Sequence, residues 1–216
     1  MSLLTLDSEP GRAIAKARLI SVLMMEDIEA ALPLAESLLN GGIRVMELTL
    51  RTPAALEAAT LIASKFPEMT VGIGTVINLE QTDAALAAGA AFGVSPGTNP
   101  NLIRHATRIG LPFGPGIMTP TDIDVAIREG CLIQKYFPAE SSGGLKHLKN
   151  IAAPFAHLGA RFIPLGGVTL RNAIEYLESD LVVAVGGSWI APQGLIQEKD
   201  WDQIEANARE AARLIG

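Results

Sequence analysis

The sequence has a single cysteine, no excess of basic residues and no long uninterrupted apolar run. One cysteine, Cys131, excludes an internal disulfide and a cysteine-based zinc site. The 17 Lys and Arg residues against 23 Asp and Glu residues argue against a duplex-binding face. No apolar stretch reaches the roughly 18 residues of a membrane span, and residues 1–11 lack the pattern of a secretory signal. We therefore expect a cytoplasmic protein with neither nucleic acid nor membrane as a partner.

The sequence shows one repeated pattern over its 216 residues. Short runs rich in Val, Ile and Leu alternate with Ala-rich helical stretches. The predicted strands are Leu19–Met25, Val45–Leu50, Val71–Val76, Phe92–Ser95, Pro112–Gly116, Leu132–Phe137, Arg161–Leu165 and Leu181–Val185. The predicted helices are Ile28–Leu39, Pro53–Lys65, Leu79–Ala88, Asn101–Arg108, Thr121–Arg128, Leu145–Ala152, Leu170–Glu178 and Asp200–Leu214.

Eight strand-then-helix units predict an α/β fold, a (β/α)8 TIM barrel. Continuous apolar runs are typical of strands that are buried on both faces, as in a parallel sheet. A doubly wound open sheet shares the alternation, but eight units without a clear switch point favour a closed barrel. No linker or low-complexity segment divides the chain, so we expect a single domain over residues 1–216. Residues 7–17 are expected to form an extra helix across the lower end.

Lys135 is the one lysine among six that stands within an apolar strand. One interpretation is that its stem packs while its amine reaches solvent. The other is an amine in a dry barrel mouth, where loss of water favours the neutral, nucleophilic form. A neutral lysine amine forms Schiff bases with ketones.

Glu47 interrupts another apolar strand, and a buried carboxylate is costly unless it is paired or functional. It could form a structural ion pair with Lys135 or Arg51, or shuttle protons beside the lysine. Arg51 and Thr75 follow at strand ends. The Arg51 guanidinium suits a carboxylate or phosphate, although a solvent-facing arginine at the rim is the plainer interpretation.

Paired glycines follow the seventh and eighth predicted strands, at Gly166-Gly167 and Gly186-Gly187, and Ser188 adds a hydroxyl. Glycines expose backbone N–H groups and let a ligand approach closely. The loops after strands 7 and 8 of such barrels often bind phosphate, although tight-turn chemistry would also explain double glycines. The three histidines have no metal-ligand spacing, so no metal site is expected.

Five segments resemble the 2-keto-3-deoxy-6-phosphogluconate (KDPG) aldolase family, which includes 4-hydroxy-2-oxoglutarate (KHG) aldolase activity. They occur in family order at predicted strand ends, and the resemblance extends from the first strand to the last helix. The segments are Glu47–Thr52, Gly72–Val76, Ser95–Gly97, Lys135–Glu140 and Gly186–Trp189.

The resemblance implies a class I aldolase, a lyase that reversibly cleaves KDPG to pyruvate and glyceraldehyde 3-phosphate. It makes Lys135 the Schiff-base residue and Glu47 the general acid and base. Arg51 and Thr75 would hold the substrate carboxylate. Pro96, Phe137 and Leu165 would line the substrate pocket, and Gly166, Gly167, Gly187 and Ser188 would bind the phosphate. It further implies a homotrimer that acts on a small 2-keto acid and needs no metal or cofactor.

One departure from the family concerns the aldehyde half of the substrate. Leu165 stands where the family commonly has threonine, so a hydroxyl is missing. This leaves open KHG, another 2-keto-3-deoxy sugar acid, or oxaloacetate decarboxylation. A non-catalytic barrel that binds a sugar phosphate is a further alternative, because fold alone does not establish catalysis. A pure binding protein would not require Lys135 together with Glu47.

Overall fold

The computed structural model describes residues 3–215, in which strands alternate with helices. Residues 1, 2 and 216, the ends of the expected domain, lie outside the described residues. The strands are β1 Leu19–Leu23, β2 Val45–Thr49, β3 Thr70–Gly74, β4 Phe92–Val94, β5 Phe113–Gly114, β6 Gly116–Ile117, β7 Ile133–Tyr136, β8 Arg161–Pro164 and β9 Val185–Gly187. The helices are α1 Glu9–Ala17, α2 Ala31–Asn40, α3 Ala55–Lys65, α4 Leu79–Ala87, α5 Pro100–Ile109, α6 Pro120–Arg128, α7 Gly144–Ala152, α8 Leu170–Leu177, α9 Gln193–Gln197 and α10 Trp201–Ile215. Short 3₁₀ helices, η1 Ile28–Ala30 and η2 Ala153–Leu158, precede α2 and follow α7.

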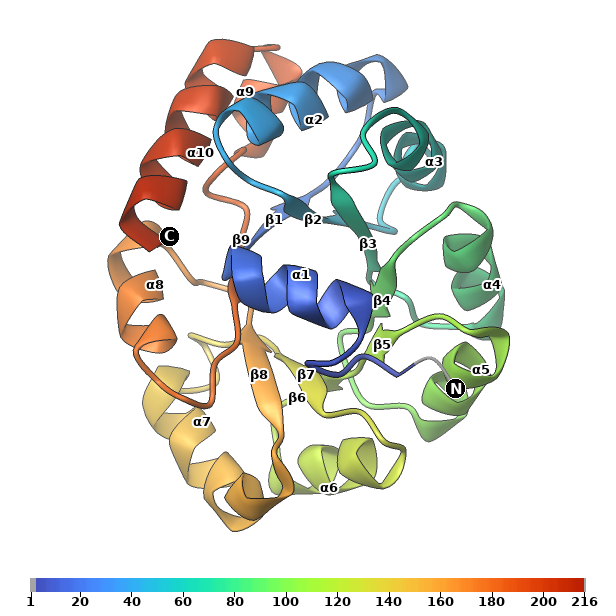
Figure 1. Cartoon of the computed structure of the whole chain (residues 1–216), viewed down its shortest axis with the longest axis vertical. Coiled ribbons are helices and arrows are strands. Elements are labelled where there is room, and N and C mark those ends of the chain that lie inside the picture. The colour runs from blue at the N-terminus through green and yellow to red at the C-terminus, as the bar shows by residue number, and fades with distance from the viewer. Residues whose placement is uncertain (1–2, 216) are drawn as a thin grey trace.

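The strands form a curved parallel arrangement with the larger helices outside it (Figure 1). The assigned ladders make a six-stranded sheet, β5-β4-β3-β2-β1-β9, and a three-stranded sheet, β6-β7-β8. The predicted strand Pro112–Gly116 is divided into β5 and β6, because Pro115 has no N–H to donate to a ladder. The Pro115 carbonyl still accepts a hydrogen bond from the Lys135 N–H at 2.9 Å.

The last strand begins later than predicted. The predicted strand is Leu181–Val185, whereas the observed strand β9 covers Val185–Gly187. Val182 forms an isolated bridge to Phe162. The cause is a change of partner along one segment. Its first residues hydrogen-bond to β8, where Phe162 donates to Leu181 at 2.8 Å, and its last residues pair with β1.

Side-chain alternation divides the apolar residues into two clusters. The larger lies between the strands and the helices. The smaller fills the inside of the strand arrangement and consists of Leu4, Ile14, Ile20, Val45, Phe92, Val94, Ile133, Ile163, Leu165 and Ala184. Because Glu47 and Lys135 follow Val45 and Ile133 by two residues, their side chains point to the same inner face.

Helix α1 lies across one end of the strand arrangement (Figure 1). It begins after Ser8, whose hydroxyl accepts a hydrogen bond from the Gly11 N–H, and its Ile14 is fully buried in the inner cluster. The helix expected over residues 7–17 is therefore present as α1. The inner face closes at this end, which leaves the carboxyl ends of the strands for the site.

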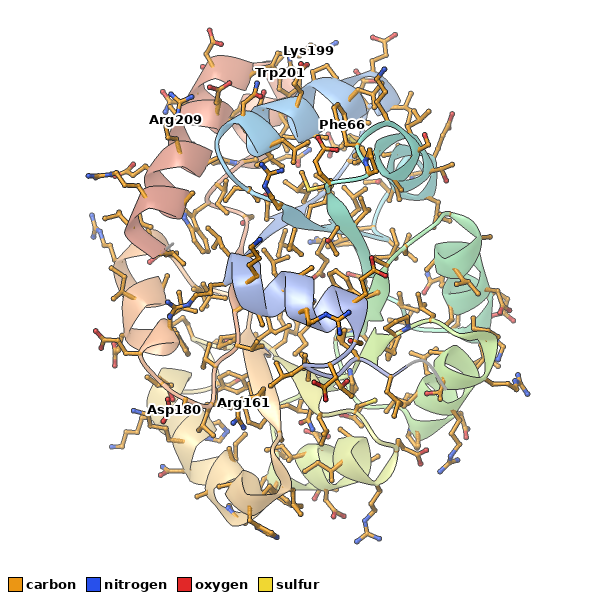
Figure 2. The ribbon with its side chains drawn as sticks, viewed as in Figure 1. Phe66, Arg161, Asp180, Lys199, Trp201 and Arg209 are labelled. Carbon is orange, nitrogen blue, oxygen red and sulfur yellow. The ribbon has the colours of Figure 1, made fainter. Side chains whose placement is uncertain are left out.

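Trp201 is a large aromatic side chain of the outer helices. Trp201, at the start of α10, lies at the periphery with Lys199 and Arg209 (Figure 2), and it packs against the outer cluster. Within residues 3–215, no helix is long and apolar enough to cross a bilayer.

Candidate active site

Lys135 on β7 and Glu47 on β2 form a buried ion pair. The Lys135 Nζ donates to Glu47 Oε1 at 2.8 Å, and the two residues are 6% and 1% exposed. The Phe137 ring centroid lies 5.3 Å from the same nitrogen. Breaking such a pair by removing one partner leaves an uncompensated buried charge, so the two groups depend on each other. The arrangement places an amine and a proton carrier in contact in a buried site.

Gly74, at the end of β3, provides the space that the Glu47 carboxylate occupies. A Cβ atom added at Gly74 would lie 1.9 Å from Glu47 Oε1. The strands β2 and β3 pair in parallel, with Thr49 opposite Gly74. Gly74 lies within the predicted strand Val71–Val76, and sequence reasoning assigned it no role. The available signal was a glycine inside an apolar strand, which often marks a close approach of neighbouring groups.

A cavity of about 410 Å³ opens at the carboxyl ends of the strands. All of the predicted site residues line it: Glu47, Arg51, Thr75, Pro96, Lys135, Phe137, Leu165, Gly166, Gly167, Gly187 and Ser188. Gly186, one of the paired glycines, also lines the cavity. Sequence reasoning assigned no site role to the other lining residues, which are Val22, Leu23, Met24, Thr49, Val168, Ala191 and Gln193.

Cavity size alone does not identify this site. A second cavity of about 410 Å³ lies next to α1, at the opposite end, and a third, of about 730 Å³, lies near the start of the chain. The charged residues of the second cavity, Lys16, Arg44 and Glu68, are all exposed. Of these three cavities, as lined by residues 3–215, the one at the carboxyl ends of the strands alone contains a buried ion pair. We therefore take it as the candidate active site.

Arg51 and Thr75 stand at the rim on neighbouring strand ends. Below them, the Thr49 hydroxyl donates to the Leu23 carbonyl at 3.0 Å and ties β2 to β1. Thr75 adopts a left-handed conformation with φ 60°, which is uncommon for a residue other than glycine. Such conformations are costly and concentrate at functional sites, where the surrounding structure holds them in place.

The glycine segment after β8 is held against the segment after β7. The Glu140 N–H donates to the Gly166 carbonyl at 3.0 Å, and the Ala139 N–H donates to the Leu165 carbonyl at 2.7 Å. Gly166 and Gly167 both have positive φ, and a Cβ atom added at Gly167 would lie 2.7 Å from the Glu140 Cβ. Glycine is therefore required here on both conformational and steric grounds.

Several backbone N–H groups at this end of the cavity have no acceptor among the described residues. Within residues 3–215, the N–H groups of Gly166, Gly167 and Ser188 donate no hydrogen bond to the chain. The ring of Trp189 packs against Gly187, where an added Cβ would lie 1.7 Å from the ring. Trp189 therefore has a packing role, and the unpaired N–H groups remain available as uncharged hydrogen-bond donors.

Two buried tyrosines hydrogen-bond to the segment after β7, which contacts the glycine segment. The Tyr176 hydroxyl on α8 donates to Glu140 Oε1 at 2.5 Å, and the Tyr136 hydroxyl donates to the Gly144 carbonyl at 3.2 Å. Burial, together with the Glu140 carboxylate, raises the pKa of Tyr136 to about 12. Burial and the hydrogen bond to Glu140 also raise the pKa of Tyr176. Both hydroxyls thus stay protonated, as donors, at neutral pH.

The remaining chemical candidates lie outside the cavity. His105 pairs with Asp83 at 2.7 Å on the surface, and His147 stacks on Tyr136. Burial, with a smaller effect from Glu129, raises the pKa of the Cys131 thiol to about 12, so this group is an inert buried residue. Among residues 3–215, no three His, Cys, Asp or Glu side chains cluster in a way that could hold a metal ion.

Comparisons with known proteins agree on one family. The sequence model of the KDPG and KHG aldolase family matches residues 11–207. The 2-dehydro-3-deoxy-phosphogluconate aldolase of Dickeya dadantii (strain 3937) is 44% identical over 89% of both chains. The KDPG aldolase of Legionella pneumophila, solved with pyruvate captured as a covalent carbinolamine intermediate, superposes with a TM-score of 0.90 at 37% identity, covering 94% of this chain and 98% of that one. The enzyme of Zymomonas mobilis ZM4, solved with 3-phosphoglycerate, superposes with a TM-score of 0.88 at 41% identity, covering 94% and 95%.

Proposed function

Because the chain belongs to the KDPG and KHG aldolase family, we propose that it reversibly cleaves KDPG to pyruvate and glyceraldehyde 3-phosphate through a Schiff base. The observation that carries the proposal is the buried pair of Lys135 and Glu47, 2.8 Å apart within the cavity at the strand ends. A lysine and a carboxylate in contact provide the nucleophile and the proton carrier that imine formation requires.

In the first stage, Glu47 takes a proton from the Lys135 ammonium of the ion pair, and the resulting neutral amine attacks the C2 ketone of the substrate. Glu47 delivers a proton to the resulting oxygen and gives a carbinolamine. Glu47 then assists loss of that oxygen as water, which leaves a protonated imine between C2 and Nζ. Phe137, whose ring centroid lies 5.3 Å from Nζ, limits access of water to this nitrogen.

In the second stage, Glu47 removes the proton of the C4 hydroxyl, directly or through a water. The C3–C4 bond breaks, its electron pair moves into the imine, and glyceraldehyde 3-phosphate leaves. The remaining enamine is protonated at C3, and water hydrolyses the imine to release pyruvate and regenerate the Lys135 amine. Each proton that Glu47 accepts is returned within the cycle, so no further reactant is required.

Arg51 and Thr75 hold the carboxylate next to the ketone. The guanidinium matches a carboxylate in bidentate contact, and Thr75 adds a hydroxyl from the neighbouring strand end. Pro96 lines the same side of the cavity. Fixing the carboxylate aligns the breaking bond with the imine, which contributes through orientation rather than through proton transfer.

The phosphate is placed at the neutral cradle of Gly166, Gly167, Gly187 and Ser188. Support comes from the positive φ of Gly166 and Gly167, and from the N–H groups that donate no bond within residues 3–215. The Zymomonas mobilis relative was solved with a phosphorylated three-carbon acid, which has the same terminal group. Backbone N–H groups in such turns bind anions without a side-chain cation.

The test is to compare kcat/KM for KDPG with kcat/KM for the same sugar acid without the phosphate. The proposal expects a loss of more than tenfold on removing the phosphate, which corresponds to about 1.4 kcal/mol. A smaller loss would contradict the phosphate site. It would favour the second candidate function, cleavage of KHG or of an unphosphorylated sugar acid, which Leu165 motivates because its side chain offers no hydroxyl.

Two features of the architecture belong to the same proposal. Residues 1–216 form one domain, and the two sheets close into a (β/α)8 barrel. Closure is supported by hydrogen bonds between β8 and the segment that leads into β9, from the Phe162 N–H to the Leu181 carbonyl at 2.8 Å and from the Val183 N–H to the Phe162 carbonyl at 3.0 Å. We place the enzyme in the cytoplasm.

We further propose the homotrimer that the family resemblance implies. Large apolar side chains lie exposed after β3 and β6, with Ile77 at 58%, Met118 at 42% and Leu79 at 41%. Exposed apolar side chains of this size favour burial against another subunit. We expect sedimentation equilibrium to show three chains per particle for the wild type and smaller species for Ile77→Glu. A wild-type monomer would contradict the trimer.

A further inference from the structure

Gln193 is a polar side chain in the cavity that the proposed mechanism leaves without a role. It follows Pro192 and begins the short helix α9. Its side chain lines the cavity together with Ser188 and Ala191. Its amide nitrogen Nε2 is buried and, within residues 3–215, has no hydrogen-bond partner. A buried donor without an acceptor is unusual in a folded protein and points to a missing partner.

Charge is distributed unevenly over the cavity lining. The charged residues that line it are Glu47, Arg51 and Lys135, and the proposed mechanism uses all of them on the 2-keto acid part of the substrate. The remainder of the lining is neutral. The aldehyde half must therefore be recognised by neutral donors, and an amide N–H is one of the few that the lining offers.

Leu165 occupies part of the cavity lining with a side chain that offers no hydrogen-bond donor. Its side chain lines the cavity, is 4% exposed, and packs so closely over Gly186 that an added Cβ there would lie 2.9 Å from the Leu165 Cγ. An aliphatic side chain cannot donate to a substrate oxygen. Any polar contact to the substrate at this place has to come from elsewhere in the lining.

We propose that Gln193 is a specificity-determining residue whose side chain turns toward the cavity when substrate binds and donates its amide N–H to an oxygen of the aldehyde half. This inference rests on the proposed aldolase function and adds to it the group that recognises the second product. The oxygen belongs either to a hydroxyl or to the terminal phosphate, and both present the same acceptor chemistry. The energetic logic is that a donor left unpaired in the empty site gains its partner on binding.

The experiment compares Gln193→Leu with Gln193→Glu, which is close in shape, and uses Gln197→Leu as the matched control. Gln197 lies on the same helix, is exposed, and donates to Glu26 on the surface at 2.9 Å. We expect kcat/KM for KDPG to fall about 10- to 100-fold in Gln193→Leu. We expect a larger fall in Gln193→Glu, because a carboxylate repels the phosphate. Gln197→Leu is expected to match the wild type.

Two substrates identify the acceptor. A loss for KDPG alone identifies the phosphate, and an equal loss for the unphosphorylated sugar acid identifies a hydroxyl. Trapping of pyruvate on the enzyme with borohydride serves as a readout without an aldehyde half. If trapping falls as much as cleavage, Gln193 has a structural role and the proposal is overturned.

The two proposals fail in different ways. A change in kcat/KM of less than about twofold in both Gln193 variants overturns the inference, while wild-type cleavage leaves the aldolase function intact. A wild type that traps no pyruvate and cleaves no substrate overturns the proposed function itself. Thermal unfolding of each variant checks that the fold is retained.

Discussion

The two halves of the cavity, which we assign to the 2-keto acid and to the aldehyde part of the substrate, differ in the chemical groups that line them. The 2-keto acid half has side-chain charges on rigid strand ends, with Lys135 and Glu47 almost fully buried and Arg51 at the rim. The aldehyde half has glycine backbone, Ser188 and Gln193 around the apolar Leu165. The charged half is placed by strands whose ladder positions are fixed, whereas the neutral half lies on the loops after β8 and β9.

This difference divides the chemistry from the choice of substrate. Imine formation needs charged groups at fixed distances, which paired strands provide. The donors proposed to recognise the aldehyde lie on loops, and loops tolerate changes in sequence better than paired strands do. Changes in the charged half should therefore abolish the reaction, while changes in the neutral half should alter which aldehyde is accepted.

The largest expected effect follows replacement of Lys135. Without the amine no imine forms, so Lys135→Ala should lower kcat/KM for KDPG by on the order of 10⁴ or more. Pyruvate release from KDPG, measured with excess enzyme, checks this. The control is Lys149→Ala, an exposed lysine on α7 that should retain full activity. Substantial cleavage by Lys135→Ala would contradict the mechanism.

A smaller loss is expected on substitution of Gly74, because this change retains both Lys135 and Glu47 but shifts the Glu47 carboxylate. Gly74→Ala puts a methyl group where Glu47 Oε1 lies, only 1.9 Å away, so the carboxylate must shift. A displacement of about 1 Å should lower kcat by about 10²-fold. Gly194→Ala is the matched control, because nothing lies within 4 Å of an added Cβ there. Equal kcat values for the two variants would show that the position of Glu47 is not critical.

In the neutral half, the effect should be selective. Leu165→Thr supplies a hydroxyl beside Gly166 and should raise kcat/KM for KDPG by about three- to tenfold, the value of one neutral hydrogen bond. Trapping of pyruvate should change little, because the threonine lies away from the ketone. If both readouts changed together, the division of the cavity into two halves would be wrong.

The smallest expected effect concerns stability at alkaline pH. A tyrosine in an unfolded chain ionises near pH 10, whereas the pKa of Tyr136 is raised to about 12 and that of Tyr176 is also raised. The folded state therefore holds these protons more tightly. Its extra stability is complete below about pH 10 and is lost as the pH rises toward 12. Urea unfolding at several pH values should show a shallower alkaline decline for Tyr176→Phe than for the wild type. Equal slopes would contradict this coupling.

Much of this architecture could be predicted from the sequence for a physical reason. Apolar runs mark buried parallel strands, and such strands end at a common edge. Residues far apart in the chain, such as Glu47 and Lys135, therefore converge without any knowledge of distances. The same reasoning placed Arg51, Thr75 and the paired glycines around one cavity.

What could not be predicted depends on contacts between segments. The role of Gly74 appears only when the Glu47 carboxylate lies against it. Gln193 lies on a five-residue helix, which is too short to show a helical period in the sequence. The late start of β9 follows from the exchange of partners between β8 and β1, which apolar runs do not encode.

The most direct test of the whole account is reductive trapping with pyruvate and borohydride, followed by intact mass and peptide mapping. Borohydride reduces an imine to a stable secondary amine, so the reacting lysine is labelled permanently. The account predicts one pyruvate-derived adduct per chain, located at Lys135. Folded protein that gains no adduct, or that gains it only at other lysines, would contradict the assignment of Lys135 as the Schiff-base residue.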